Sequence, residues 1–278
     1  MTIIEKKPFF MNDDGCLKEL IESSNKIMYR SDNGILRAYK KFTNLERANK
    51  EYEMLKEMAH ECIISLVGCL YSDDGVYIVT NLANYDVMSL IDYREDVSIE
   101  ENYVYMIIEQ MIESIVYLHS NNIVHRDIKP DNFVVFDNRP NSICVKLIDF
   151  EYSINLQFSQ SSEQFGGSPG YIPPEYNNSS EEDIDFKKVD CYQLMISVMK
   201  VATAQIGVNN MTEEQLNFIS LDTFKDPKNR KTVQEIQNEN PFKVFQIEEE
   251  IEKQTDIGHF SQQIRLLQLK TYNKVLSE

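Results

Sequence analysis

The chain has 278 residues and a mass of 32.5 kDa, and 42% of its residues are hydrophobic while 26% are charged. This balance is typical of a folded globular protein with a sizeable core and excludes a chain that is disordered throughout. The net charge of −17 argues against nucleic-acid binding, which requires a basic face, and against association with anionic membranes. An acidic surface also suits a basic substrate, although most acidic surfaces are simply solvated.

The cysteines and the N-terminus indicate the compartment. The five cysteines are Cys16, Cys62, Cys69, Cys144 and Cys191. Their number is odd and no pair has Cys-x-x-Cys spacing, so we expect buried free thiols in a reducing compartment rather than a zinc ribbon. Residues 1–12 have no apolar run long enough for a signal peptide, and the apolar stretch at 62–71 is too short to cross a bilayer. The sequence therefore predicts a cytoplasmic protein.

The first part of the chain has the pattern of a small antiparallel sheet. Strand-like runs stand at 20–21, 27–29 and 35–42, with the turn signal Asp-Asn-Gly at 32–34. In the last of these runs Ala38 and Lys40 share a face because strand side chains alternate. Two further strands are predicted at 62–67 and 75–80, separated by a turn at 72–75.

A helix is predicted between these strands. Thr43-x-x-Glu46 has the pattern of a capping box. The apolar stripe that follows consists of Leu45, Ala48, Tyr52, Leu55 and Ala59. Glu51 lies within this stripe, where a carboxylate needs a cation, and Lys40 is the obvious one. The alternatives are that Glu53 or Glu57 faces inward, or that none of the three does.

A second, longer helix leads into a dense set of polar residues. Ser98-x-x-Glu101 predicts a capping box, and the buried stripe after it consists of Val104, Ile107, Ile108, Met111, Ile115 and Leu118. The polar set stands at 123–133, IVHRDIKPDNF. In it Asp127 can accept a proton, Lys129 can neutralise a phosphoryl group and Asn132 can offer an oxygen to Mg²⁺. A surface loop that is rich in charge by accident is the alternative.

The stretch at 123–133 resembles the catalytic loop of the eukaryotic protein kinases, His-Arg-Asp-x-Lys-x-x-Asn, in the form found in serine/threonine kinases. Four other segments resemble family motifs in the family's order: Ala38-Tyr39-Lys40 for Ala-x-Lys, Asp149-Phe150-Glu151 for Asp-Phe-Gly, 167–175 for Gly-Thr-x-x-Tyr-x-Ala-Pro-Glu, and 226–232 for Asp-Pro-x-x-Arg-x-Thr. The resemblance implies an α+β, two-lobed protein kinase-like fold. We expect an N-terminal lobe at 1–82, with a small antiparallel sheet plus one helix, a mainly helical lobe at 83–243 and a helical tail at 244–278.

The resemblance also implies a reaction, the transfer of the γ-phosphoryl group of Mg-ATP to serine or threonine hydroxyls of a protein substrate. The implied catalytic residues are Asp127 as the base, Lys129 and Lys40 on the phosphates, Glu51 on Lys40, and Ser168 bonded to Asp127 and Lys129. The implied cofactor contacts are Asn132 and Asp149 to Mg²⁺, Ala38 and Lys40 to the nucleotide, Thr80, Asn81, Leu82 and Ala83 to adenine, and Asp86 to ribose. Asp190 would anchor the loop, and Glu175 would pair with Arg230.

Two departures from the family's motifs favour a different function. The stretch at 21–27, which corresponds to the family's glycine-rich phosphate loop, has no glycine. Glu151 stands where the family has glycine, and it would either weaken nucleotide binding or point to solvent. The alternative is therefore a pseudokinase that acts as a nucleotide-binding or structural interaction scaffold. A small-molecule kinase is a third reading.

Other segments carry expectations of regulation or partners. The interval from Lys40 to Glu51 is shorter than in most kinases, so the helix is expected to lack its first turns. Arg126 would pair with a phosphate on the polar stretch at 152–170, where the candidate sites are Ser159, Ser161 and Ser162; the alternative is an unmodified loop. An amphipathic helix is predicted in the tail, with Phe260, Ile264, Leu267 and Leu269 on one side. It would pack on its own domain or bind a partner.

Overall fold

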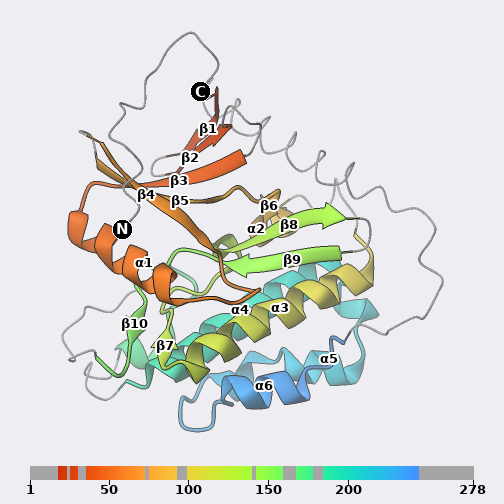
Figure 1. Ribbon diagram of the computed structural model, residues 1–278. Helices are drawn as coiled ribbons and strands as arrows, with labels where there is room; N and C mark the ends of the chain where they lie inside the picture. Colours follow the sequence, from red (N-terminus) through yellow and green to blue (C-terminus); the bar gives the residue numbers. More distant parts are fainter. Residues whose placement is uncertain are drawn as a thin grey trace, which may run out of the picture. The chain divides into compact units, whose positions relative to one another are not determined.

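The computed structural model describes residues 18–23, 26–30, 36–72, 75–92, 99–139, 142–158, 167–177 and 184–243 (Figure 1). The chain divides into two compact units. The first runs through Ala83 and also contains Asp149–Glu151, and the second contains Asn84–Ile148 and the chain from Tyr152 onward. The tail at 244–278, the serines at 159, 161 and 162, Cys16 and the turn at 32–34 lie outside the described residues.

The first unit contains a five-stranded antiparallel sheet in the order β1-β2-β3-β5-β4 (Figure 1). The strands are β1 Lys18–Ser23, β2 Lys26–Arg30, β3 Leu36–Phe42, β4 Leu66–Ser72 and β5 Gly75–Asn81. Ala38 is opposite Thr80 and Lys40 is opposite Ile78. Directly opposed residues lie on the same face of a sheet, so Ala38, Lys40 and Thr80 share one face.

The strand predicted at 62–67 is confirmed only in part, because β4 begins at Leu66 and continues to Ser72. Cys62, Ile63 and Ile64 are buried, as their apolar character predicts, but they precede the strand. The backbone N–H of Ile63 donates to the carbonyl oxygen of His60, and that of Cys62 donates to His60 Nδ1. These turn hydrogen bonds use donors that a longer strand would need for its ladder.

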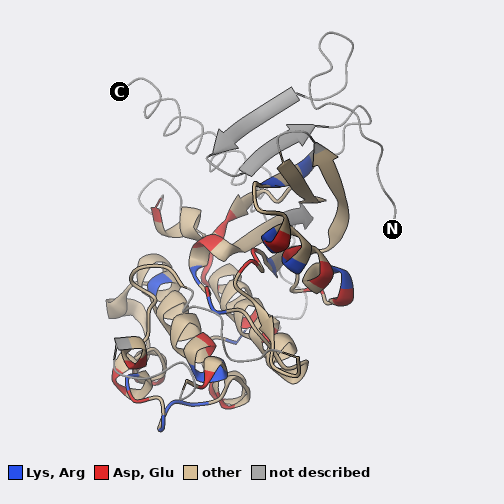
Figure 2. Ribbon diagram, turned by 90° about the vertical axis from the view of Figure 1, so that its left-hand side faces the viewer, with Lys and Arg blue, Asp and Glu red and all other residues tan. Residues whose placement is uncertain are grey.

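The helix that the structure describes in the first unit is α1, Leu45–Glu57. Its cap is Asn44 rather than Thr43, since Asn44 Oδ1 accepts hydrogen bonds from the backbone N–H of Glu46 at 2.9 Å and of Arg47 at 3.1 Å. The predicted stripe is also wrong in part. The buried residues of the helix are Ala48, Glu51 and Leu55, and Met58 at its C-cap is buried as well, whereas Leu45 is 53% exposed. Acidic and basic residues are interspersed along the remaining surface of α1 (Figure 2).

The second unit is mainly helical. Its helices are α2 Val87–Asp92, α3 Glu101–Ser120, α4 Phe186–Gln205, α5 Glu213–Phe218 and α6 Val233–Glu239, with short 3₁₀ turns at Pro130–Asn132, Pro174–Asn177, Val208–Asn210 and Leu221–Phe224. Helix α3 packs against α4 and α6 (Figure 1). Small strands complete the unit: β6 Tyr85–Asp86, β8 Phe133–Arg139 and β9 Ser142–Leu147 in one sheet, and β7 Ile123–Val124 with β10 Ile154–Asn155 in another. The predicted α+β class is confirmed.

Helix α3 confirms the predicted stripe, because all six of its residues are buried. The predicted capping box is wrong. The helix begins at Glu101 with Glu100 as its N-cap, whereas Ser98 lies outside the described residues, and no side chain that the structure describes caps the helix. The carbonyl oxygen of Glu100 accepts from the N–H groups of Tyr103 and Val104, so the backbone alone starts the hydrogen-bond ladder here.

The cysteines of the described residues are all free thiols. Cys62 and Cys191 are buried as expected, but Cys69 and Cys144 are partly exposed. Burial raises the pKa of the Cys191 thiol to about 12, which keeps it protonated and unreactive. Within the described part of the chain no helix is both long and apolar enough to cross a membrane.

Candidate active site

The loop between β7 and β8 brings together the polar residues that the sequence singled out. Lys129 Nζ lies 3.0 Å from Asp127 Oδ2 and donates a hydrogen bond of 2.6 Å to Ser168 Oγ. Asn132 Nδ2 donates to the carbonyl oxygen of Asp127 at 2.8 Å and to its Oδ2 at 3.3 Å. The predicted bond between Ser168 and Asp127 is absent among the described residues, because Lys129 stands between the two and bonds to both.

Asp127 has one carboxylate oxygen in use and one that no described residue contacts by a hydrogen bond. The residue is only 4% exposed, and its buried Oδ1 makes no hydrogen bond in the part of the chain that the structure describes. Buried acceptors of this kind are uncommon, because an unmade hydrogen bond costs about 1–3 kcal/mol. Asp127 therefore presents an acceptor that a donor from outside the described chain can fill.

Two side chains of α4 hold the backbone of this loop. Asp190 is fully buried; its Oδ2 accepts from His125 N–H and its Oδ1 from Arg126 N–H, both at 2.8 Å. Gln193 Oε1 accepts from Ile128 N–H at 2.9 Å, and its Nε2 donates to the carbonyl oxygen of Arg126 at 3.2 Å. Arg126 has a φ of 71°, a left-handed conformation that an arginine rarely adopts, and these bonds fix it.

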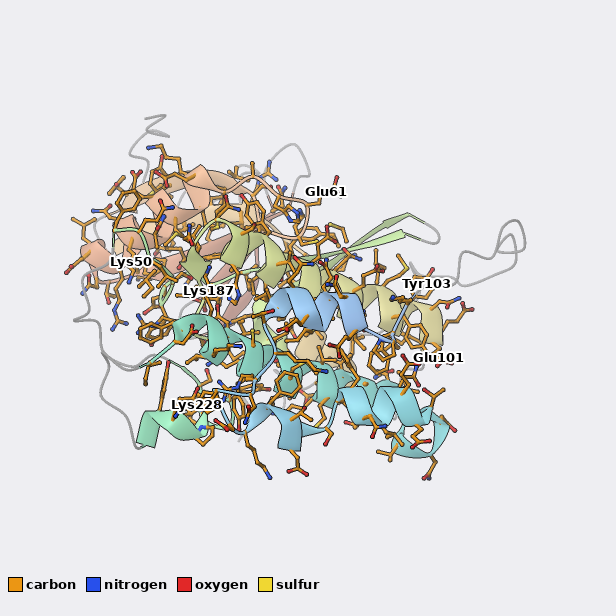
Figure 3. All side chains as sticks on the ribbon, turned by 90° about the horizontal axis from the view of Figure 1, so that it is seen from below. Lys50, Glu61, Glu101, Tyr103, Lys187 and Lys228 are labelled. Atoms are coloured by element: carbon orange, nitrogen blue, oxygen red, sulfur yellow. The ribbon has the colours of Figure 1, made fainter. Side chains whose placement is uncertain are left out.

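Asp190 was predicted as an anchor of the loop, and its bonds confirm that prediction. It lies inside α4, whose N-cap is Asp185. Gln193 was missed. The signal that could have revealed it is its position three residues after Asp190, on the same helix face, as a polar residue among apolar neighbours. Lys187, labelled in Figure 3, also ties α4 to the end of α3, since its Nζ donates to the carbonyl oxygen of His119 at 2.8 Å.

Arg126 itself has contacts within the second unit. Its side chain is 1% exposed, and its guanidinium lies 4.8 Å from the centre of the Phe186 ring. Burial raises the pKa of the nearby Tyr176 hydroxyl, and the positive charge of Arg126 opposes that shift. The serines with which its phosphate contact was predicted lie outside the described residues.

The predicted pair of Glu175 and Arg230 is present as a bidentate ion pair. Arg230 Nη1 lies 2.7 Å from Glu175 Oε1, and Nη2 lies 3.1 Å from Oε2. The Arg230 side chain is completely buried, and it also donates to the carbonyl oxygens of Phe224 and Lys188. A charge with this many acceptors around it can remain ionised in the protein interior.

The first unit has its own cluster of charged side chains around Lys40. Lys40 Nζ lies 2.5 Å from Glu51 Oε2 and 2.5 Å from Asp149 Oδ1. Burial disfavours the charge of Lys40, but Glu51 and Asp149 outweigh burial and raise the pKa of the lysine. Burial raises the pKa of Glu51 to about 7; Lys40 opposes this shift, and Asp149 and Glu151 add to it. Glu51 is thus the carboxylate that faces inward, while Glu53 and Glu57 are exposed.

Glu151 belongs to the same cluster. Its Oε1 lies 2.5 Å from Arg47 Nη1, and its Oε2 lies 3.8 Å from Lys40 Nζ. The expectation that Glu151 simply points to solvent is wrong, because its side chain is only 20% exposed and is paired.

The residues predicted to contact adenine and ribose lie around the end of β5 and just before α2. Thr80 and Asn81 end β5, Leu82 and Ala83 follow it, and Asn81 Oδ1 accepts a hydrogen bond from Arg37 Nη1. Asp86 lies in the second unit, where its Oδ1 accepts from the N–H of Ser89 at 2.8 Å and from the Ser89 hydroxyl at 2.9 Å, so it caps the start of α2. Their contacts with a nucleotide stay predictions.

Comparison with known proteins identifies the family. The profile described as the protein kinase domain matches residues 35–265. The chain belongs to the eukaryotic-type protein kinase family. The matched segment contains both the Lys40 cluster and the loop around Asp127, so the two sets of residues described above are parts of one kinase domain.

Individual relatives are more distant. The human liver/testis gamma catalytic chain of phosphorylase b kinase is 32% identical over 140 residues, which cover 50% of this chain and 33% of that protein. The calcium/calmodulin-dependent protein kinase type II of Caenorhabditis elegans is 33% identical over 136 residues, covering 48% and 18%. The human serine/threonine-protein kinase ULK1 is 29% identical over 175 residues, covering 61% and 16%. The kinase chain thus spans a third or less of the length of these relatives.

Proposed function

We propose that this kinase domain is an active serine/threonine protein kinase that transfers the γ-phosphoryl group of Mg-ATP to a protein hydroxyl. The observation that carries the proposal is Oδ1 of Asp127, which accepts no hydrogen bond from the described residues and belongs to the carboxylate beside the ammonium group of Lys129. A substrate hydroxyl that donates to this oxygen would be oriented for attack and could lose its proton to the carboxylate as the new bond forms. Lys129 would remain within reach of the transferred group.

The donor chemistry of the other residues fits phosphate and magnesium. Bound Mg-ATP supplies the phosphoryl group and a divalent charge that offsets its negative oxygens. Lys40 has three N–H donors and can bind a phosphate oxygen while it keeps Glu51 and Asp149. Asn132 uses its amide nitrogen within the loop, which leaves its Oδ1 as the acceptor for a hard cation, and Asp149 carries the carboxylate oxygens that magnesium prefers.

The nucleotide contacts follow from the resemblance. Backbone groups of residues 80–83 would hydrogen-bond adenine, and Ala38, on the same sheet face as Lys40, would contact the base. Asp86 would contact ribose through the oxygen that does not cap α2.

The test is magnesium-dependent transfer of labelled phosphate from ATP to the protein itself and to a generic basic protein. We expect Asp127→Asn to reduce transfer by at least about 100-fold, while the thermal stabilisation by Mg-ATP is retained. Asp131→Asn is the matched control, because it makes the same chemical change at an exposed position in the same loop. Equal turnover in the Asp127 variant and the wild type would refute the role of Asp127 as the base.

A pseudokinase scaffold is the second candidate. It is favoured by the absence of glycine from residues 18–30, where β1 and β2 pair with Ser23 opposite Lys26. Without glycine the backbone of this hairpin approaches phosphates less closely. Wild-type protein that takes up no label, together with no thermal shift on addition of Mg-ATP, would favour this scaffold.

A further inference from the structure

Glu151 stands where the family's Asp-Phe-Gly motif has glycine, and its carboxylate lies close to the charged groups of Arg47 and Lys40. Its carboxylate meets the guanidinium of Arg47 with 2.5 Å between Oε1 and Nη1. Both residues belong to the first unit, although 104 positions separate them in the sequence. A glycine at position 151 could not make this contact.

Arg47 is placed so that the contact restrains α1. It stands in the first turn of the helix, four residues before Glu51, so the two side chains lie on the same helix face. The cap residue Asn44 bonds to the backbone N–H of Arg47 and fixes the start of the helix. The distance from Arg47 to Glu51 along the helix axis is about 6 Å.

Two separate links therefore join one face of α1 to the three-residue segment Asp149–Glu151. One is indirect and runs from Glu51 through Lys40 to Asp149, with both distances at 2.5 Å. The other is the direct pair of Arg47 and Glu151. A single link acts as a pivot about which a helix can turn or tilt, whereas two links one turn apart prevent that rotation.

The charges of the cluster explain why Arg47 and Glu151 belong together. Three carboxylates, those of Glu51, Asp149 and Glu151, surround Lys40. Without Arg47, Glu151 would remain 3.8 Å from the ammonium group that the other two carboxylates already share. It would then compete for Lys40. Arg47 supplies the second cation and draws the carboxylate of Glu151 away from that competition.

We infer that Glu151 is a positioning residue, which acts through Arg47 to hold α1 on the Asp149 segment and so keeps Glu51 on Lys40. Its effect on turnover rests on the proposed phosphoryl transfer, because Lys40 and Asp149 affect a rate only if that reaction occurs. Its effect on the position of α1 is independent of any reaction. Arg47 is 55% exposed, so solvent screens the pair and we expect modest fold-changes.

The experiment compares wild type, Arg47→Met, Glu151→Gln, the double variant and the conservative Arg47→Lys. Hydrogen–deuterium exchange of the α1 amides measures how firmly the helix is held, and steady-state kinetics measures kcat and KM for a basic protein acceptor. Lys56→Met is the matched control, since Lys56 pairs with Glu53 on the same helix at 3.1 Å, and both residues are exposed.

We expect Arg47→Met and Glu151→Gln each to speed exchange in α1, and to lower kcat, by about two- to five-fold, with KM for the acceptor unchanged. The double variant should change the exchange rate and kcat no more than Arg47→Met does, because it removes the competing carboxylate as well. Arg47→Lys keeps the positive charge and should therefore keep most of the wild-type exchange protection and kcat. Lys56→Met should change neither quantity.

Two results would overturn the inference: a double variant whose effect is the product of the single effects, or an equal effect of Lys56→Met. Wild-type protein without transfer that depends on Asp127 would refute the proposed function instead. In that case the exchange measurements alone decide whether Glu151 positions α1.

Discussion

The ion pair between Glu175 and Arg230 allows a quantitative test of how the second unit is held together. In Glu175→Gln the guanidinium of Arg230 stays completely buried but loses its counter-charge. Breaking a buried pair from one side typically costs about 3–5 kcal/mol, because an uncompensated charge remains. Arg230 keeps its bonds to the carbonyl oxygens of Phe224 and Lys188, so we expect the lower end, about 3 kcal/mol.

The assay is urea unfolding followed by circular dichroism, because the chain has no tryptophan to report by fluorescence. In the double variant Glu175→Gln with Arg230→Met, the free energy of unfolding should fall by less than the sum of the losses in the two single variants, since no buried charge remains. Asp222→Asn is the matched control and should have no measurable effect, because its pair with Lys225 at 2.7 Å is exposed. A loss below about 0.5 kcal/mol in Glu175→Gln would show that the pair is not buried as described.

Three further predictions concern single side chains. Asp190→Asn replaces one carboxylate oxygen by an amide N–H₂ group, which cannot accept a hydrogen bond from a backbone N–H. We expect the free energy of unfolding in a urea titration to fall by about 1–3 kcal/mol, and kcat to fall as well. Burial raises the pKa of Glu51 from 4.5 to about 7. Between pH 4.5 and pH 7 the folded state therefore binds a proton that the unfolded state has already lost. The free energy of unfolding of wild type should therefore fall, relative to that of Glu51→Gln, by up to about 3 kcal/mol as the pH rises from 4.5 to 7, and titrations at both pH values measure this difference. Asn44→Ala removes the cap of α1 and should cost about 1 kcal/mol in the same unfolding assay.

The features that the sequence predicted well are those encoded by neighbouring residues. The apolar stripe of α3 repeats at helical spacing from Val104 to Leu118, and the structure buries all of its residues. The polar loop after it carries its residue types in a fixed order, so Asp127, Lys129 and Asn132 could be selected without knowledge of the fold. Family motifs then added the distant partner Arg230 for Glu175.

The features that the sequence could not predict depend on choices between similar residues or on distant contacts. Thr43 and Asn44 are both good helix caps, and only the path of the chain into α1 selects Asn44. Gln193 bonds to Ile128, 65 residues away, and Arg47 bonds to Glu151, 104 residues away. No local pattern marks either pair, because neither forms part of a helix cap, a turn or a strand ladder.

The buried polar residues of the second unit bear on the choice between an enzyme and a scaffold. Asp190, Gln193 and Ser197 form a polar stripe on α4, where apolar side chains would satisfy a packed core more simply. Asp190 and Gln193 of this stripe bond to the backbone of the loop between β7 and β8 and hold Arg126 in its left-handed conformation. A scaffold could use the same helix to support a loop of any shape. It has no physical need for a loop that keeps a buried carboxylate oxygen of Asp127 unpaired within the described chain, at a cost of about 1–3 kcal/mol. A donor from outside the described chain offsets that cost, and in the proposed reaction the substrate hydroxyl is such a donor.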